Sequence, residues 1–119
     1  MSEIVIYTST ENQTQIEVTF DNETIWLSLN QISELFARDK SVISRHLKKI
    51  FETNEVIFEA TVAKNATVQL EAGREVKRDI EFYNLDAIIS VGYRVNPVKG
   101  TQFLQWATQV MNKNYKLVA

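Results

Sequence analysis

The sequence predicts an α+β fold in which residues 1–119 form a single domain. Apolar and polar residues alternate near the N-terminus and again in the middle of the chain, as they do in half-buried strands. Between these stretches, and at the C-terminal end, the apolar residues recur at helical spacing. The chain contains three glycines, one proline and 45% hydrophobic residues, so it has no linker-like stretch to divide it.

A β-hairpin is the first element expected. Residues 16–20 alternate apolar with polar side chains, and residues 24–27 form a second apolar run. Asp21 and Asn22 between them are residues that favour turns. The β-branched run at residues 4–7 is expected beside this hairpin.

Two short helices are expected next. Ser28 is a good N-cap for the first and Asp39 for the second, which covers about residues 39–51. The apolar residues of the first helix are Leu29, Ile32, Leu35 and Phe36. Those of the second helix are Ile43, Leu47, Ile50 and Phe51. At 100° per residue, each set falls on one stripe.

Strands are predicted again at residues 56–58, 68–70 and 79–82, with a turn at Ala72 and Gly73. Two helices then close the chain as a helical hairpin. Asn84 caps the first, which is expected to end at Gly92, and Asn96 with Pro97 opens the second.

The last helix has a wide apolar arc, made of Phe103, Leu104, Trp106, Ala107, Val110 and Met111. This arc predicts a homodimer with Trp106 at its interface. There are two alternatives: the N-terminal hairpin, through Phe20 and Trp26, covers the second side of this helix within one chain, or downstream residues of a longer protein cover it.

Charge is unevenly distributed along the chain, although the net charge is only −2. Residues 1–37 contain six acids and no lysine or arginine, whereas residues 38–51 contain five bases and one acid. Screening confines electrostatic fields to roughly 8–10 Å, so a local basic patch still attracts phosphates. The chain has no cysteine, signal peptide or membrane-length apolar run, which predicts a cytoplasmic protein without disulfides or thiolate metal sites.

Residues 27–50 meet the requirements of a helix-turn-helix: a bracing helix, a tight turn, and a second helix with one apolar and one polar face. The fold expected is therefore a winged helix-turn-helix core with an N-terminal β-hairpin and a C-terminal helical hairpin. The polar stripe of the second helix consists of Ser41, Ser44, Arg45 and Lys48. Its serines keep this face slim enough for a major groove about 12 Å wide.

These residues predict sequence-specific binding of double-stranded DNA in transcriptional regulation. Arg45 is expected to read guanine through O6 and N7, and Ser41 and Ser44 to bond phosphates or base edges. Phosphate contacts are expected from Arg38, Lys40, Lys48 and Lys49. The free N–H groups at the Asp39-capped helix end suit a phosphate as well.

Other interpretations stay open. The pair of helices can be structural, with a solvated basic face, and the fold can act as a protein-interaction adaptor without touching DNA. It can also be the specificity module of a longer protein. No enzyme, cofactor, metal or small-molecule ligand is predicted.

The chain resembles the virulence RhuM family, on two stretches that together cover nearly its whole length. The first is residues 39–51 (DKSVISRHLKKIF). The second is residues 80–95 (IEFYNLDAIISVGYRV), followed by 99–103 (KGTQF) and 106–110 (WATQV). The layout is more loosely similar to the Bro-N and KilA-N domains of phage antirepressors. The resemblance implies a bacterial protein of mobile elements or pathogenicity islands with a DNA-binding N-terminal domain, and it implies no catalytic residues.

Several further residues have both a functional and an ordinary interpretation. For His46, a phosphate contact or a solvated side chain is expected, because no second histidine or cysteine exists to form a metal or nucleophile site. Glu75 and Lys77 echo the Glu-x-Lys of metal-dependent nucleases, with Glu71 and Asp79 as neighbouring acids, but so short a match is expected by chance.

The stretch 56–82 is either a wing that contacts DNA or an ordinary surface hairpin. Its candidate contacts are Lys64, Arg74, Lys77 and Arg78. Tyr93, Arg94 and Lys99 are expected in a loop between the last two helices, where packing and solvation are favoured over a second DNA or partner contact.

Overall fold

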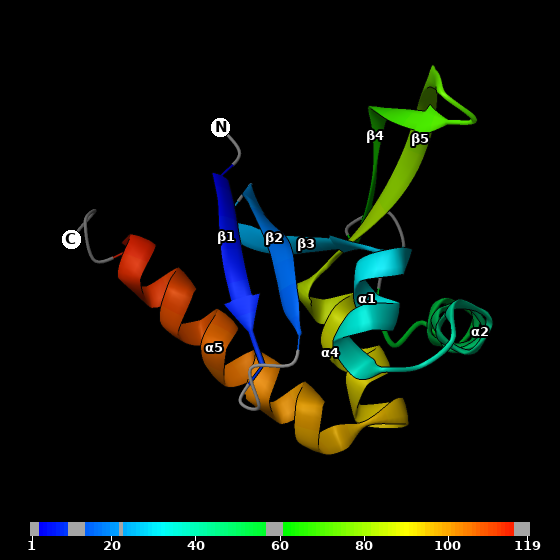
Figure 1. Cartoon of the computed structure of the whole chain (residues 1–119). Coiled ribbons are helices and arrows are strands. Elements are labelled where there is room, and N and C mark those ends of the chain that lie inside the picture. The colour runs from blue at the N-terminus through cyan, green and yellow to red at the C-terminus, as the bar shows by residue number, and fades with distance from the viewer. Residues whose placement is uncertain (1–2, 10–13, 22, 57–60, 116–119) are drawn as a thin grey trace.

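An antiparallel sheet and a set of helices make up the structure, which is α+β as predicted (Figure 1). The structure is a computed structural model that describes residues 3–9, 14–21, 23–56 and 61–115, with the backbone alone at 64–69 and 114–115. The strands are β1 (Glu3–Thr8), β2 (Gln15–Asp21), β3 (Thr24–Ser28), β4 (Val62–Glu71) and β5 (Arg74–Asn84), in the sheet order β1-β2-β3-β5-β4. The helices are α1 (Leu29–Phe36), α2 (Lys40–Glu52), α4 (Leu85–Val95) and α5 (Pro97–Tyr115).

The N-terminal hairpin predicted from the alternation is confirmed, since β2 and β3 pair antiparallel. Strand β1 pairs with β2 over its whole length, so the first apolar run does lie beside the hairpin. Alternate residues point into the core, and Ile16, Val18, Ile25 and Leu27 are buried there.

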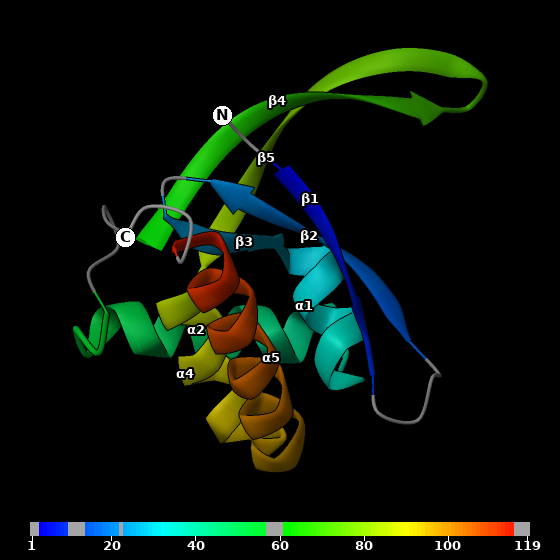
Figure 2. The ribbon, with the colours of Figure 1, turned by 90° about the vertical axis from the view of Figure 1, so that its left-hand side faces the viewer.

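A long hairpin of β4 and β5 extends away from the other strands (Figure 2). Ala72 and Gly73 connect its strands, and both have positive φ, which is the conformation of a type I′ turn. The predicted turn is confirmed. Only residues Phe82 to Asn84 of β5 also pair with β3, so most of the hairpin is held by its own two strands.

Of the strand predicted at residues 56–58, only Val56 lies among the described residues. Val56 lies in a bend and not in a strand, so the prediction is wrong at this residue. Helix α2 ends in a tight turn in which Asn54 is left-handed and the Glu55 N–H donates to the Ile50 carbonyl. This turn leaves Val56 packed against the core rather than paired in the sheet.

Helix α4 does not end at Gly92, as expected, but continues to Val95. The glycine serves close packing: a Cβ added there would lie 2.6 Å from Cζ of Phe36 and 3.2 Å from Cα of Gly100. Tyr93 and Arg94 are consequently helical, and Lys99 lies in the first turn of α5. The expected loop between these helices is reduced to Asn96.

Helix α5 packs against the inner face of β1. The Tyr7 ring makes edge contacts with Phe103 and Trp106, at centroid distances of 5.1 and 5.0 Å. Strand β1 thus covers part of the apolar arc within the chain, and Trp106 is partly buried there. Within the part of the chain that the structure describes, no helix has the length and hydropathy to cross a bilayer.

Candidate nucleic-acid interface

A three-residue turn joins α1 to α2. Ala37 adopts the left-handed conformation, with φ of 54°, and its N–H donates to the Glu34 carbonyl. The Arg38 N–H donates to the Ser33 carbonyl, and the Ser33 hydroxyl donates to the Arg38 carbonyl. These bonds satisfy the last carbonyls of α1 and turn the chain sharply into α2.

Asp39 begins α2, as predicted. Its carboxylate accepts the Ser41 N–H at 3.1 Å and the Ser41 hydroxyl as well. These bonds, first that from the hydroxyl, lower the pKa of Asp39. The Ser41 hydroxyl proton is therefore engaged in the cap, which leaves only its oxygen lone pairs for a ligand.

One face of α2 is buried and the other is exposed. Ile43 and Ile50 are fully buried and Leu47 nearly so, as the apolar stripe predicts. The exposed residues include every predicted contact on this helix: Lys40, Ser41, Ser44, Arg45, Lys48 and Lys49. At 100° per residue, Arg45 and Lys48 lie near the middle of the exposed face.

Glu52 was missed by the sequence reasoning. It is exposed and lies seven positions after Arg45, so it falls on the same stripe, one turn beyond Lys48. The spacing alone would have found it. A carboxylate there repels phosphates, so the basic part of the face ends near Lys49.

Arg38 lies elsewhere than on this face. One nitrogen of its guanidinium donates to the Val95 carbonyl at 3.2 Å, at the C-terminal end of α4. A positive charge at that position also interacts favourably with the helix dipole. Arg38 thus ties the α1–α2 turn to α4.

His46 is half-buried rather than freely solvated. Burial lowers the pKa of His46, and the positive charges of Arg94, Arg45 and Arg38 lower it further. Its imidazole is therefore neutral at pH 7. A neutral, half-buried imidazole makes a poorer phosphate contact than the solvated side chain expected from the sequence.

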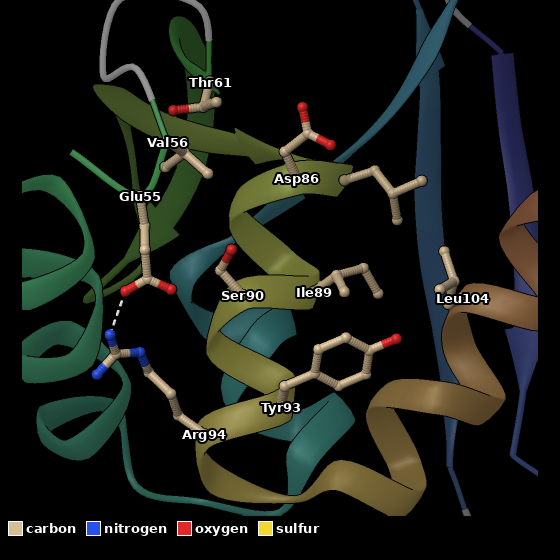
Figure 3. Close-up of a pocket in the computed structure, with 10 residues that line it drawn as sticks. Glu55, Val56, Thr61, Asp86, Ile89, Ser90, Tyr93, Arg94 and Leu104 are labelled. Atoms are coloured by element: carbon tan, nitrogen blue, oxygen red, sulfur yellow. Dashed lines mark hydrogen bonds and ion pairs between the residues drawn. The ribbon is translucent and has the colours of Figure 1, made fainter. Parts of the chain in front are cut away.

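A groove of about 770 Å³ runs along α4, beside the segment that follows α2 (Figure 3). Helix α4 contributes Leu85, Asp86, Ile89, Ser90, Tyr93 and Arg94 to its lining. At one end, Arg94 forms an ion pair with Glu55, just beyond α2. This pair holds the C-terminal end of α2 against α4.

The β4–β5 hairpin carries a mixture of charges. Arg78 donates two hydrogen bonds to Glu71, at 2.6 and 2.7 Å, and lowers the pKa of the Glu71 carboxyl. This predicted wing contact is thus already paired within the hairpin. Arg74 and Lys77 are exposed, whereas the Lys64 side chain lies outside the described part of the structure.

The acids of the Glu-x-Lys stretch do not form a metal site in the described part of the structure. Glu71, the acid nearest the turn, is engaged by Arg78. Over the described ranges, no group of three or more His, Cys, Asp or Glu residues is arranged to hold a metal ion.

Residues 60–117 match a family model described as the Virulence protein RhuM family. This part of the chain belongs to that family. The RhuM resemblance is confirmed over its second block, which lies in β5, α4 and α5. No curated protein and no solved structure matches the chain.

The RhuM match includes the β4–β5 hairpin, α5 and α4, which packs against α2, but it includes neither α1 nor α2 itself. Arg94, which holds the end of α2, lies within the matched residues, and the contacts predicted for DNA lie before them. The family match therefore concerns elements that pack around α2 and not α2 itself. The interpretation of the exposed face of α2 depends on the residues described above.

Proposed function

We propose that the chain binds double-stranded DNA through α2, as a winged helix-turn-helix protein that acts in transcriptional regulation. The observation that carries the proposal is the exposed face of α2, where Arg45, Lys48 and Lys49 stand in solvent opposite a fully buried apolar stripe. None of these three side chains forms an ion pair with another described residue. A rigid helix with a slim, basic, solvent-facing side suits the major groove.

The exposed residues other than Ser41, whose hydroxyl bonds Asp39, and the acidic Glu52 have assigned roles in this proposal. Arg45, at the middle of the face, reads a guanine through its O6 and N7 atoms. Ser44 is small and lies beside it, within reach of a base edge or a phosphate. Lys40, Lys48 and Lys49 neutralise phosphates and set the register of the helix on the duplex. Arg38 acts indirectly, since its bond to the Val95 carbonyl positions the turn that precedes α2.

The β4–β5 hairpin is proposed as the wing. It follows α2 in the chain and carries Arg74 and Lys77 on exposed positions of β5. In Figure 1 the hairpin and α2 both lie on the right-hand side of the molecule, with the hairpin tip above the helix. A duplex seated on α2 would bring its flanking phosphates toward this side.

The test is selection of binding sites from random DNA, followed by titration of the selected site. Arg45→Ala should weaken binding by about 1–3 kcal/mol and relax the preference at one base position. Lys113→Ala is the matched control, because Lys113 is an exposed base on α5, away from α2. Recovery of the same motif with equal affinity by the Arg45 variant would contradict the assignment of Arg45 as the reading residue.

Two alternatives make different predictions in the same experiment. A protein-interaction adaptor would show no salt-dependent DNA binding with any sequence. A specificity module of a longer protein would bind DNA here and would be joined to a further domain in the full-length gene.

A further inference from the structure

Strand β1 lies at one edge of the sheet, and among the residues that the structure describes β2 is the only strand that pairs with it. The opposite edge is β4, whose sequence includes Lys64 and the polar residues Asn65 and Gln69. Lysine on an edge strand is a common protection against pairing with another chain. Strand β1 contains no lysine, arginine or proline, and its only charged residue is Glu3. By sequence, β4 thus carries a residue type that protects an edge strand, whereas β1 does not.

The β1 edge is also apolar on its outer face. Ile4 is 57% exposed and Ile6 is 50% exposed, and both are β-branched residues suited to strands. Val5 and Tyr7 point to the opposite face, where Tyr7 packs against Phe103. An exposed apolar edge strand is a surface to which a further strand can add.

One hydrogen bond shows which backbone groups of β1 bond to β2 and which do not. Ser9 and Thr14 form the next pair after Thr8 and Gln15 in the β1–β2 register, and the Ser9 N–H donates to the Thr14 carbonyl at 2.9 Å. Backbone groups alternate in direction along an antiparallel strand. Val5 and Tyr7 thus bond toward β2, whereas the N–H and C=O groups of Ile4 and Ile6 point out from the sheet edge.

We propose that β1 pairs antiparallel with β1 of a second copy of the chain, about a two-fold axis at Val5. In this register, Ile4 lies opposite Ile6 of the second copy, and each such pair exchanges both backbone hydrogen bonds. Val5 lies opposite Val5 of the second copy in a pair without hydrogen bonds. The two sheets then continue into one another across the interface.

The second copy is the occupant that this strand fits, because residues 4–6 (Ile-Val-Ile) read the same in both directions. A two-fold interface needs such self-complementarity. The antiparallel register also sets Glu3 opposite Tyr7 of the second copy rather than against a second Glu3. Helix α5 passes β1 and ends beyond it, on the side where the second copy would lie (Figure 1). The dimer interface is thus the β1 edge and not Trp106, and it does not depend on DNA binding.

The first experiment is sedimentation of the protein without DNA across the micromolar range. Wild type should show a concentration-dependent dimer, because a pair of short strands is at the low end of stable interfaces. The variant Ile4→Lys/Ile6→Lys places lysines opposite lysines and should be monomeric throughout. The control Leu70→Lys/Val98→Lys changes two exposed apolar residues by the same charge, away from β1, and should dimerise as wild type does.

The second experiment tests the register with a single thiol, since the natural chain has no cysteine. Pairs without hydrogen bonds have Cα atoms about 4.5 Å apart, within the range of a disulfide. Val5→Cys should therefore form a covalent dimer on mild oxidation. Ile6→Cys introduces a more exposed thiol, but the thiol of one copy would lie diagonally from that of the other, too far apart for a disulfide. This variant should therefore remain monomeric on gels run without reducing agent.

The outcomes separate the inference from its competitors. A wild type that is monomeric at every concentration overturns it, and so does equal cross-linking of the two cysteine variants. Dimerisation that persists in the double lysine variant places the interface elsewhere. Dimerisation without DNA binding would support this interface and contradict the proposed function instead.

Discussion

Helix α2 and the β4–β5 hairpin are both rich in charged residues, but α2 carries four bases against one acid, whereas the hairpin carries four of each. The hairpin pairs some of its charges internally, as Arg78 does with Glu71. Arg45 and Lys48 of α2 have no such partner among the described residues. The unbalanced charge of α2 is thus free to act on a ligand, whereas the hairpin has equal numbers of bases and acids and pairs Arg78 with Glu71.

The two regions differ in their support as well. Helix α2 is packed on the core through fully buried residues such as Ile43 and Ile50. Most of the hairpin is held only by its own strands, and β3 reaches it at Phe82 to Asn84 alone. A reading surface needs a rigid base, while a hairpin of this kind can open locally without unfolding the domain.

The largest expected effect is on the packing beneath α2. Leu47→Ala should lower the free energy of unfolding by about 2–5 kcal/mol, because it leaves a cavity against Ile43 and the other buried residues. Val76→Ala, at a half-buried position of the hairpin, should change it by about 1 kcal/mol or less. Urea unfolding measures both. Equal effects would mean that the hairpin is as integral to the core as α2.

The next effect is on the salt dependence of DNA binding. Lys48→Ala or Lys49→Ala should reduce the log–log salt slope by about one unit for each lost phosphate contact. Arg78→Ala should leave the slope unchanged, because Glu71 already holds that guanidinium. Titrations across a salt series decide this, and an unchanged slope for both lysines would remove them from the interface. A reduced slope for Arg78→Ala would show that DNA displaces the Glu71 pair.

The smallest effect concerns two alanines in the same strained conformation. Ala37 in the α1–α2 turn and Ala72 in the hairpin turn have φ of 54° and 52°. The left-handed conformation costs about 1–2 kcal/mol for a residue with a Cβ, and a glycine removes this strain. Part of the stabilisation is offset, because glycine has more conformational freedom in the unfolded chain and loses more of it on folding. Ala37→Gly should therefore raise the free energy of global unfolding by roughly 0.5–1 kcal/mol.

Ala72→Gly relieves the same strain but should act locally. Amide exchange in the distal hairpin should slow, while global unfolding remains as in wild type. Equal shifts in global stability for the two variants would show that the hairpin unfolds together with the helices, and the contrast between the regions would not hold.

Much of the local structure could be predicted because its causes lie within a few residues. Ser28, Asp39 and Asn84 cap the helices that they were expected to cap, since each side chain bonds an N–H two or three positions ahead. The buried and exposed faces of α2 follow from residue spacing in the same way. The α+β class and the turn at Ala72 and Gly73 were predicted on similarly local grounds.

The errors arose where one residue type has two uses. Gly92 was interpreted as a helix terminator, but its lack of a Cβ permits the contact with Phe36 and lets α4 continue. Trp106 was assigned to a dimer interface from its helical spacing alone, whereas its contact with the Tyr7 ring joins it to β1 within the chain. Neither partner is close in sequence, so no local pattern distinguishes the two uses.

The sequence by itself determined the helix caps, the amphipathic faces, the hairpin turn and the position of the basic segment, because these depend on neighbours within about one turn or one strand pair. Tertiary structure alone decided that Arg38 braces α4, that Glu55 pairs with Arg94, and that β1 forms an edge of the sheet. These features depend on contacts between residues distant in the chain. Such contacts form only once the core has packed, and the free energy of that packing selects among side-chain pairings that local spacing leaves equivalent.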